Sequence, residues 1–193
     1  METESVSADR LGAFGCDRLI ALFLLFMEVR KMKKIGIIMG SDSDLPIIQK
    51  AVDVLKSFEV PYEVHIYSAH RTPVEARDFA LTAREKDFGV LIAAAGMAAH
   101  LAGAIAANTT LPVIGIPCKG PVLDGMDALL ATVQMPTGIP VATVAINGGA
   151  NAALLALQIL AVSEPELAEK LDAKRAKDAA AVLAKGASVM EKL

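Results

Sequence analysis

Short apolar runs recur along the chain and alternate with stretches whose apolar residues follow a helical spacing. Runs of four to six residues of this kind are typical of strands covered on both faces of a parallel sheet. The predicted strands are 35–39, 62–67, 90–94, 112–117 and 141–146. Predicted helices begin near residues 45, 74 and 126, another reaches about residue 108, and the last covers 150–162.

This alternation of strands and helices predicts an α/β protein with a parallel sheet between two helical layers. Five strands favour a three-layer α/β/α sandwich of flavodoxin-like order 2-1-3-4-5. The helix at 150–162 is apolar nearly all round, which predicts burial between subunits. Residues 164–193 are charged and favour helix, so we expect a helical tail of the same domain, 32–163.

Residues 1–31 differ from the rest in pattern. The apolar run 19–27 is shorter than the roughly 20 residues that a membrane span requires, and the acidic start lacks the basic region of a signal peptide. We expect Met32 to be the natural start and residues 1–31 to come from an upstream start. The alternative is a short helix that packs on a neighbouring subunit.

Composition and charge narrow the possible functions. Hydrophobic residues make up 54% of the 193 residues and aromatic residues 4%, so the core of one domain must consist mainly of Ala, Val, Ile and Leu. The net charge of −3 and the absence of a basic block argue against a nucleic-acid partner. Two cysteines without a metal-ligand cluster fit a reducing cytoplasm. We expect no metal, no membrane and a cytoplasmic location.

The segment 68–73 carries the strongest candidate chemistry. It follows a predicted strand and precedes a predicted helix, and open α/β sheets bind ligands at this end of their strands. Arg71 offers a permanently charged fork suited to phosphate or carboxylate, and His70 can exchange a proton near neutral pH. The alternative is a capping turn with a surface arginine.

Two further loops are candidate walls of the same pocket. Residues 40–44 place hydroxyls and N–H groups before a helix, which suits an anion such as phosphate, and Asp44 could accept hydrogen bonds from ribose hydroxyls. The alternative is an ordinary turn capped by Ser43 or Asp44. His100 lies in a turn rich in Ala and Gly, where a lone histidine is often a hydrogen-bonded core residue, and His65 is interpreted as structural or exposed.

Several familiar sites are absent from the sequence. It contains no G-x-G-x-x-G, no P-loop lysine and no G-x-S-x-G elbow. The third predicted strand ends without the aspartate of a phosphoacceptor receiver, and the loops lack the aromatic residues that a flavodoxin places beside its flavin. What remains is a pocket for a small phosphorylated ligand with one imidazole for proton transfer.

Six motifs occur in an order that resembles a known enzyme family. They are Gly40-Ser41-x-Ser43-Asp44, Ser68-Ala69-His70-Arg71-Thr72-Pro73, Ala98-Ala99-His100-Leu101, Leu111-Pro112-Val113, residues 133–143 (VQMPTGIPVAT) and Asn151-Ala152-Ala153-Leu154-Leu155. Together they resemble carboxyaminoimidazole ribonucleotide mutase of bacterial purine synthesis, over about residues 34–162. The third loop and the segment 119–121 depart from the common pattern, with Met97 for a glycine, Ala102 for a proline and Lys-Gly-Pro where serine is frequent.

The resemblance implies movement of a carboxylate from an exocyclic nitrogen to a ring carbon, without ATP, metal or organic cofactor. It also implies a homo-octamer, a ribonucleotide substrate and a functional link to the ATP-dependent enzyme that makes this substrate. His70 would be the general acid and base. The implied substrate-binding residues are Ser41, Ser43 and Arg71 for phosphate, Asp44 for ribose, Ser68, Ala69, Gly96 and Ala98 for the base and carboxylate, and also His100 and Leu101.

Two other functions remain open from the sequence. A sister group that carboxylates aminoimidazole ribonucleotide directly with carbon dioxide tends to have Lys after the His and Arg-Ser-Asn in the third loop. Arg71 and the segment 99–101 favour the mutase over that group. The second alternative is a non-catalytic nucleotide-binding module, in which His70 is dispensable.

Overall fold

A five-stranded parallel sheet forms the centre of the part of the chain that the computed structural model describes, residues 32–190. The strand order is β2-β1-β3-β4-β5, so the predicted order 2-1-3-4-5 is confirmed. The strands are β1 (Lys34–Met39), β2 (Tyr62–Ile66), β3 (Phe88–Gly96), β4 (Val113–Cys118) and β5 (Ala142–Thr143). The expectations for residues 1–31, including a start at Met32, lie outside the described residues.

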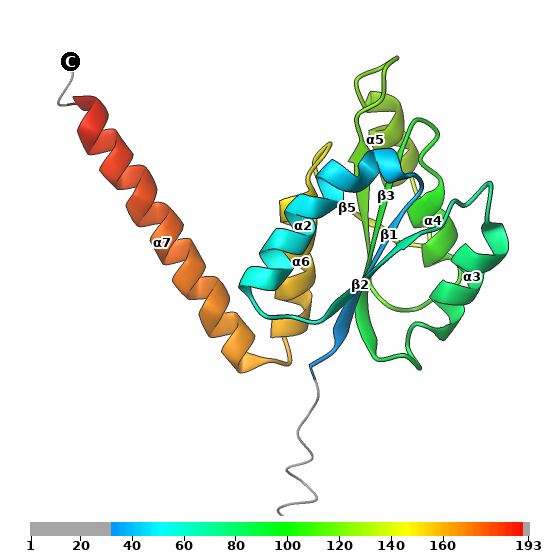
Figure 1. The fold of residues 1–193 in the computed structure, drawn as a ribbon, viewed down its shortest axis with the longest axis horizontal. Coiled ribbons are helices and arrows are strands. Elements are labelled where there is room, and N and C mark those ends of the chain that lie inside the picture. Colours follow the sequence, from blue (N-terminus) through cyan, green and yellow to red (C-terminus); the bar gives the residue numbers. More distant parts are fainter. Residues whose placement is uncertain (1–31, 191–193) are drawn as a thin grey trace, which may run out of the picture. The chain divides into compact units, whose positions relative to one another are not determined.

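Helices cover both faces of the sheet, as the alternation predicts (Figure 1). One layer contains α2 (Leu45–Ser57) and α6 (Gly149–Ala161), and the other contains α3 (Pro73–Thr82), α4 (Leu101–Ala106) and α5 (Met126–Val133). Successive side chains of a strand point to opposite faces. Ile35 and Ile37 therefore join the core beneath α2 and α6, while Ile38 joins the core beneath α3 and α4. None of the helices in the described residues is long and apolar enough to cross a membrane.

The edge strand β5 is much shorter than the predicted run 141–146. Only Ala142 and Thr143 pair with β4. The chain continues beside β4, where the N–H of Asn147 donates to the carbonyl of Pro117 at 2.9 Å. Because Pro117 has no N–H to donate in return, the regular ladder stops there.

The start of α2 also differs from the prediction. A short 3₁₀ turn, η2 (Asp42–Asp44), precedes α2, and its cap is Ser41, whose Oγ accepts from the N–H of Ser43 at 3.3 Å. Asp44 occupies the N-cap position of α2, one of the two predicted positions, but its side chain makes no capping hydrogen bond there. The carboxylate of Asp44 is thereby left available to the neighbouring pocket.

The last two helices pack against each other. Ala152, Ala153 and Leu157 of α6 are fully buried against α2 and the sheet. The helix α7 (Pro165–Met190) follows, and Leu167 and Leu171 bury its first turns in the same core. Most side chains described after Leu171 are exposed. Burial of α6 between subunits stays a prediction.

Candidate functional site

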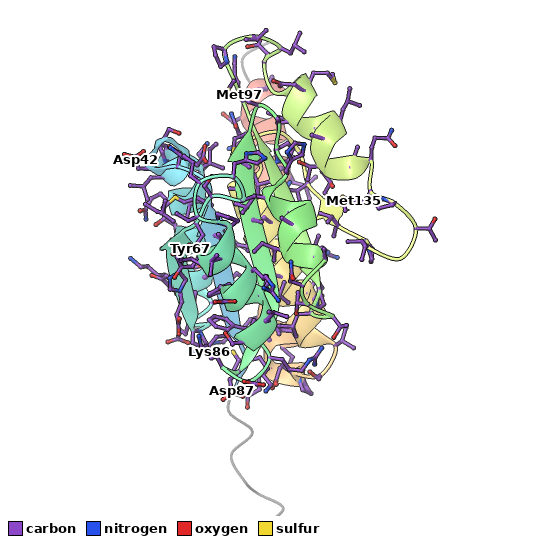
Figure 2. All side chains as sticks on the ribbon, turned by 90° about the vertical axis from the view of Figure 1, so that its right-hand side faces the viewer. Asp42, Tyr67, Lys86, Asp87, Met97 and Met135 are labelled. Carbon is purple, nitrogen blue, oxygen red and sulfur yellow. The ribbon has the colours of Figure 1, made fainter. Side chains whose placement is uncertain are left out.

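A cavity of about 560 Å³ opens at the carboxyl ends of β1, β2, β3 and β4. Figure 2 shows Asp42 and Met97 at this end of the sheet, with Lys86 and Asp87 at the opposite end. The structure brings every predicted site residue to this cavity, namely Ser41, Ser43, Asp44, Ser68, Ala69, His70, Arg71, Gly96, Ala98, His100 and Leu101. His65 lies outside it, stacked on Tyr67 with ring centroids 5.2 Å apart.

The loop after β2 is held by hydrogen bonds between its own ends. The N–H of Ser68 donates to Oγ1 of Thr72 at 2.8 Å, and the N–H of Thr72 donates to the carbonyl of Ser68 at 2.9 Å. Oγ of Ser68 accepts from the N–H groups of His70 and Arg71 at 3.4 and 3.2 Å. These bonds give the loop one conformation, which presents His70 and Arg71 to the cavity.

His70 is hydrogen-bonded to a second imidazole in the cavity wall. Its Nε2 lies 2.8 Å from Nδ1 of His100, and the two rings are nearly perpendicular at 88°. A hydrogen bond of this length requires one nitrogen to donate and the other to accept, so the pair shares one proton. Both histidines are exposed, which excludes the alternative that His100 is a buried core residue.

Arg71 connects the loops after β1 and β2. Its Nη2 donates to the carbonyl of Gly40 at 2.8 Å, which brings the guanidinium beside Ser41 and Ser43 in the cavity wall. Guanidinium and hydroxyl groups are donors that match phosphate oxygens. This end of the cavity is therefore suited to an anion.

Asp44 is a buried carboxylate in the wall of the cavity. Only 8% of it is exposed, and this burial raises its pKa, although hydrogen bonds from the Cys118 thiol and the Ser41 backbone oppose the rise. Cys118 lies beneath it, and burial together with the charge of Asp44 raises the pKa of the thiol to about 12. The thiol therefore stays protonated and can donate to Asp44.

Five further wall residues received no role from the sequence, namely Ala95, Met97, Lys119, Gly120 and Pro121. Lys119 directly follows the carboxyl end of β4, so the rule that identified His70 and Arg71 also predicts it. Met97 adopts a left-handed backbone with φ of 54°, a conformation that glycine adopts without strain. Within residues 32–190, no group of three or more His, Cys, Asp or Glu side chains could hold a metal ion.

The fold and this cavity define a flavodoxin-like α/β protein with a ligand pocket at the carboxyl edge of its sheet. The chain belongs to the AIR carboxylase family, whose profile matches residues 34–181.

Several curated relatives are similar to this chain. The N5-carboxyaminoimidazole ribonucleotide mutase of Pyrococcus abyssi is 59% identical over 140 residues, 72% of this chain and 80% of the relative. The mutase of Thermotoga maritima is 52% identical over 140 residues, 72% of this chain and 82% of the relative. The phosphoribosylaminoimidazole carboxylase of Ogataea methanolica is 56% identical over 131 residues, which are 68% of this chain but 24% of that longer protein.

Two solved structures share the fold. A variant of Treponema denticola PurE2, with one serine replaced by aspartate, superposes with a TM-score of 0.72 at 26% identity, covering 80% of this chain and 96% of that one. Treponema denticola PurE superposes with a TM-score of 0.68 at 28% identity, covering 78% and 94%.

Proposed function

We propose that this protein is an N5-carboxyaminoimidazole ribonucleotide mutase of purine biosynthesis. It moves a carboxylate from the exocyclic nitrogen to the ring carbon of aminoimidazole ribonucleotide. The contact between His70 and His100 in a pocket with an anion-binding end carries the proposal, because it supplies a proton-transfer group beside a phosphate site. Relatives that bear this name, and that align over about four fifths of their length, support the assignment.

His70 gives a proton in the first half of the proposed reaction and takes one back in the second half. It protonates the exocyclic nitrogen as the nitrogen–carbon bond breaks and carbon dioxide leaves. The ring carbon then attacks the carbon dioxide, and His70 takes the proton that this carbon loses. General acid–base catalysis of this kind contributes on the order of 10²–10⁴-fold. His100, at 2.8 Å, orients the ring of His70 and sets which of its nitrogens holds the proton.

The substrate lies across the carboxyl edge of the sheet in this proposal. Arg71, Ser41 and Ser43 bind the phosphate, and Asp44 accepts hydrogen bonds from the ribose. A buried carboxylate with a raised pKa gains from such donors, because they replace the water that burial removed.

The base and its carboxylate occupy the far end of the cavity in this proposal. They lie against Ser68, Ala69, Gly96, Ala98, His100 and Leu101. Gly96 is closely packed, since a Cβ on it would lie 3.3 Å from the carbonyl of Cys118. A wall of such small residues can hold carbon dioxide and exclude water while the carboxylate moves.

The assembly of the protein and the supply of its substrate are the last parts of the proposed function. Large apolar side chains are exposed along α5 and the loop before it, namely Val122, Leu123, Met126, Leu130 and Val133. Such a surface is typical of a protein interface, and we propose that copies of this chain form a homo-octamer in the cytoplasm. An ATP-dependent enzyme would supply the nitrogen-carboxylated substrate, and the mutase itself would need no cofactor.

The decisive experiment supplies the purified protein with the nitrogen-carboxylated ribonucleotide in the absence of bicarbonate. We expect the carbon-carboxylated product to form rapidly. Its ultraviolet absorbance monitors the reaction. No turnover of either this substrate or aminoimidazole ribonucleotide with bicarbonate would overturn the proposed function and favour a non-catalytic nucleotide-binding module.

Direct carboxylation of aminoimidazole ribonucleotide is the second candidate. The resemblance to fungal phosphoribosylaminoimidazole carboxylases, 56% and 52% identical, favours it. The chain spans about a quarter of the length of these proteins. Product that forms only from aminoimidazole ribonucleotide and high bicarbonate would select this candidate.

A further inference from the structure

We propose that Lys119 determines specificity by binding the migrating carboxylate at the end of the pocket opposite Arg71. The inference rests on the proposed function and adds a substrate contact to it. Lys119 lines the cavity beside Gly120 and Pro121, in a segment that the family resemblance leaves unassigned.

The sheet brings Lys119 next to the loop that would hold the base. Gly96, the last residue of β3, pairs with Cys118, the last residue of β4. The loops after the two strands therefore begin side by side, and Lys119 is the first residue of the second loop. The N–H of Lys119 donates to Oδ1 of Asn147 at 2.8 Å, which holds the backbone of Lys119 independently of its ammonium group. Substitution of the Lys119 side chain therefore leaves the loop anchored.

The pocket has a cation at each end. Among the described residues that line it, Arg71 and Lys119 are the only lysine or arginine side chains. Arg71 follows β2 and Lys119 follows β4, and the order β2-β1-β3-β4 separates these strands by three spacings of about 4.8 Å each. His70 and His100 follow β2 and β3. The proposed substrate likewise carries an anionic phosphate at one end and a carboxylate at the other.

The ammonium group of Lys119 has a resting partner in its own loop. Nζ lies 3.0 Å from Oδ1 of Asp124, and these side chains are 58% and 79% exposed. Exposed pairs of this kind contribute little to stability, so Lys119 can exchange Asp124 for a carboxylate at small cost. The next residue, Gly120, has no side chain that could lie between Lys119 and Met97. A Cβ on Gly120 would lie 3.7 Å from Cγ of Met97.

The test compares two nucleotides that differ only in the carboxylate. Calorimetry measures the Kd of the carbon-carboxylated product and of aminoimidazole ribonucleotide for the full-length protein and its Lys119→Met variant. We expect the variant to bind the carboxylated nucleotide about 10- to 100-fold more weakly, the range for a charge-assisted hydrogen bond, and aminoimidazole ribonucleotide unchanged. Lys119→Arg should restore most of the loss.

Two controls make the result specific. Lys170→Met removes an exposed lysine that pairs with Glu59 at 2.9 Å outside the cavity, and it should change neither Kd. Asp124→Asn should bind the carboxylated nucleotide at least as tightly as the unmodified protein. Equal losses for both nucleotides, no loss, or a matching loss in Asp124→Asn would overturn the role of Lys119. Absence of turnover in the unmodified protein would instead overturn the proposed function.

Discussion

Nε2 of His70 lies 2.8 Å from Nδ1 of His100, and this hydrogen bond joins the loops after β2 and β3. The two residues are 30 positions apart, and each follows a different parallel strand. Because one of these nitrogens must donate to the other, removal of His100 takes away the partner that orients His70 without removing His70 itself.

His100→Asn should lower kcat about 10-fold and raise KM by less, because His70 is no longer oriented while His100 is one of several residues that contact the base. Steady-state kinetics of this variant and of the unmodified protein measures both parameters.

His70→Asn provides the reference for that experiment. It should fold and bind nucleotide but lose turnover by about 10²–10⁴-fold, because the proton donor and acceptor is absent. Near-normal activity in this variant would falsify the catalytic role.

Arg71→Ala should raise KM about 10- to 100-fold with a smaller effect on kcat, because the lost guanidinium binds a phosphate that does not react. Arg84 is a matched control, because it lies outside the cavity. Its Nη2 donates to Oγ1 of Thr110, and this hydrogen bond is 2.9 Å long. An Arg84→Ala variant should keep the normal KM, and an unchanged KM in Arg71→Ala would contradict the phosphate contact.

Asp44→Asn should make the free energy of unfolding less dependent on pH. The pKa of this carboxyl is raised in the folded protein from an ordinary 3.8, so between the two values the folded state keeps a proton that the unfolded state has lost. The wild-type protein therefore loses stability as pH rises through this window, and Asp44→Asn does not. Urea unfolding from pH 3.5 to 7 measures the difference, and parallel curves for the two proteins would contradict the shift.

Gly149→Ala should destabilise the fold by about 1–3 kcal/mol, because a Cβ at Gly149 would collide with the backbone carbonyl of Ile47 where α6 meets α2. Gly186 in α7 is the matched control, because a Cβ there meets no atom within 4 Å. Gly186→Ala should be neutral or stabilise by up to about 1 kcal/mol. Thermal unfolding of both variants gives the comparison, and equal melting temperatures would refute the close contact.

Most of the fold follows from local patterns in the sequence. Each predicted strand corresponds to an observed one. The strands β1, β3 and β4 are apolar runs that are largely buried, and such runs are readable without their neighbours. The length of β5 was predicted wrongly, because it depends on the N–H groups that β4 offers, and Pro117 lacks one. The helix cap at Ser41 was missed because hydroxyls and carboxylates compete for such positions.

The alternation of strands and helices along the chain predicts a parallel sheet, and parallel strands place the loops that follow them at the same edge. Which side chains touch at that edge follows from the three-dimensional fold. Contacts between strands distant in sequence produce the hydrogen bond between His70 and His100, the burial of Asp44 and the place of Lys119 in the wall of the pocket. Such contacts depend on register and packing, which no local pattern of residues specifies.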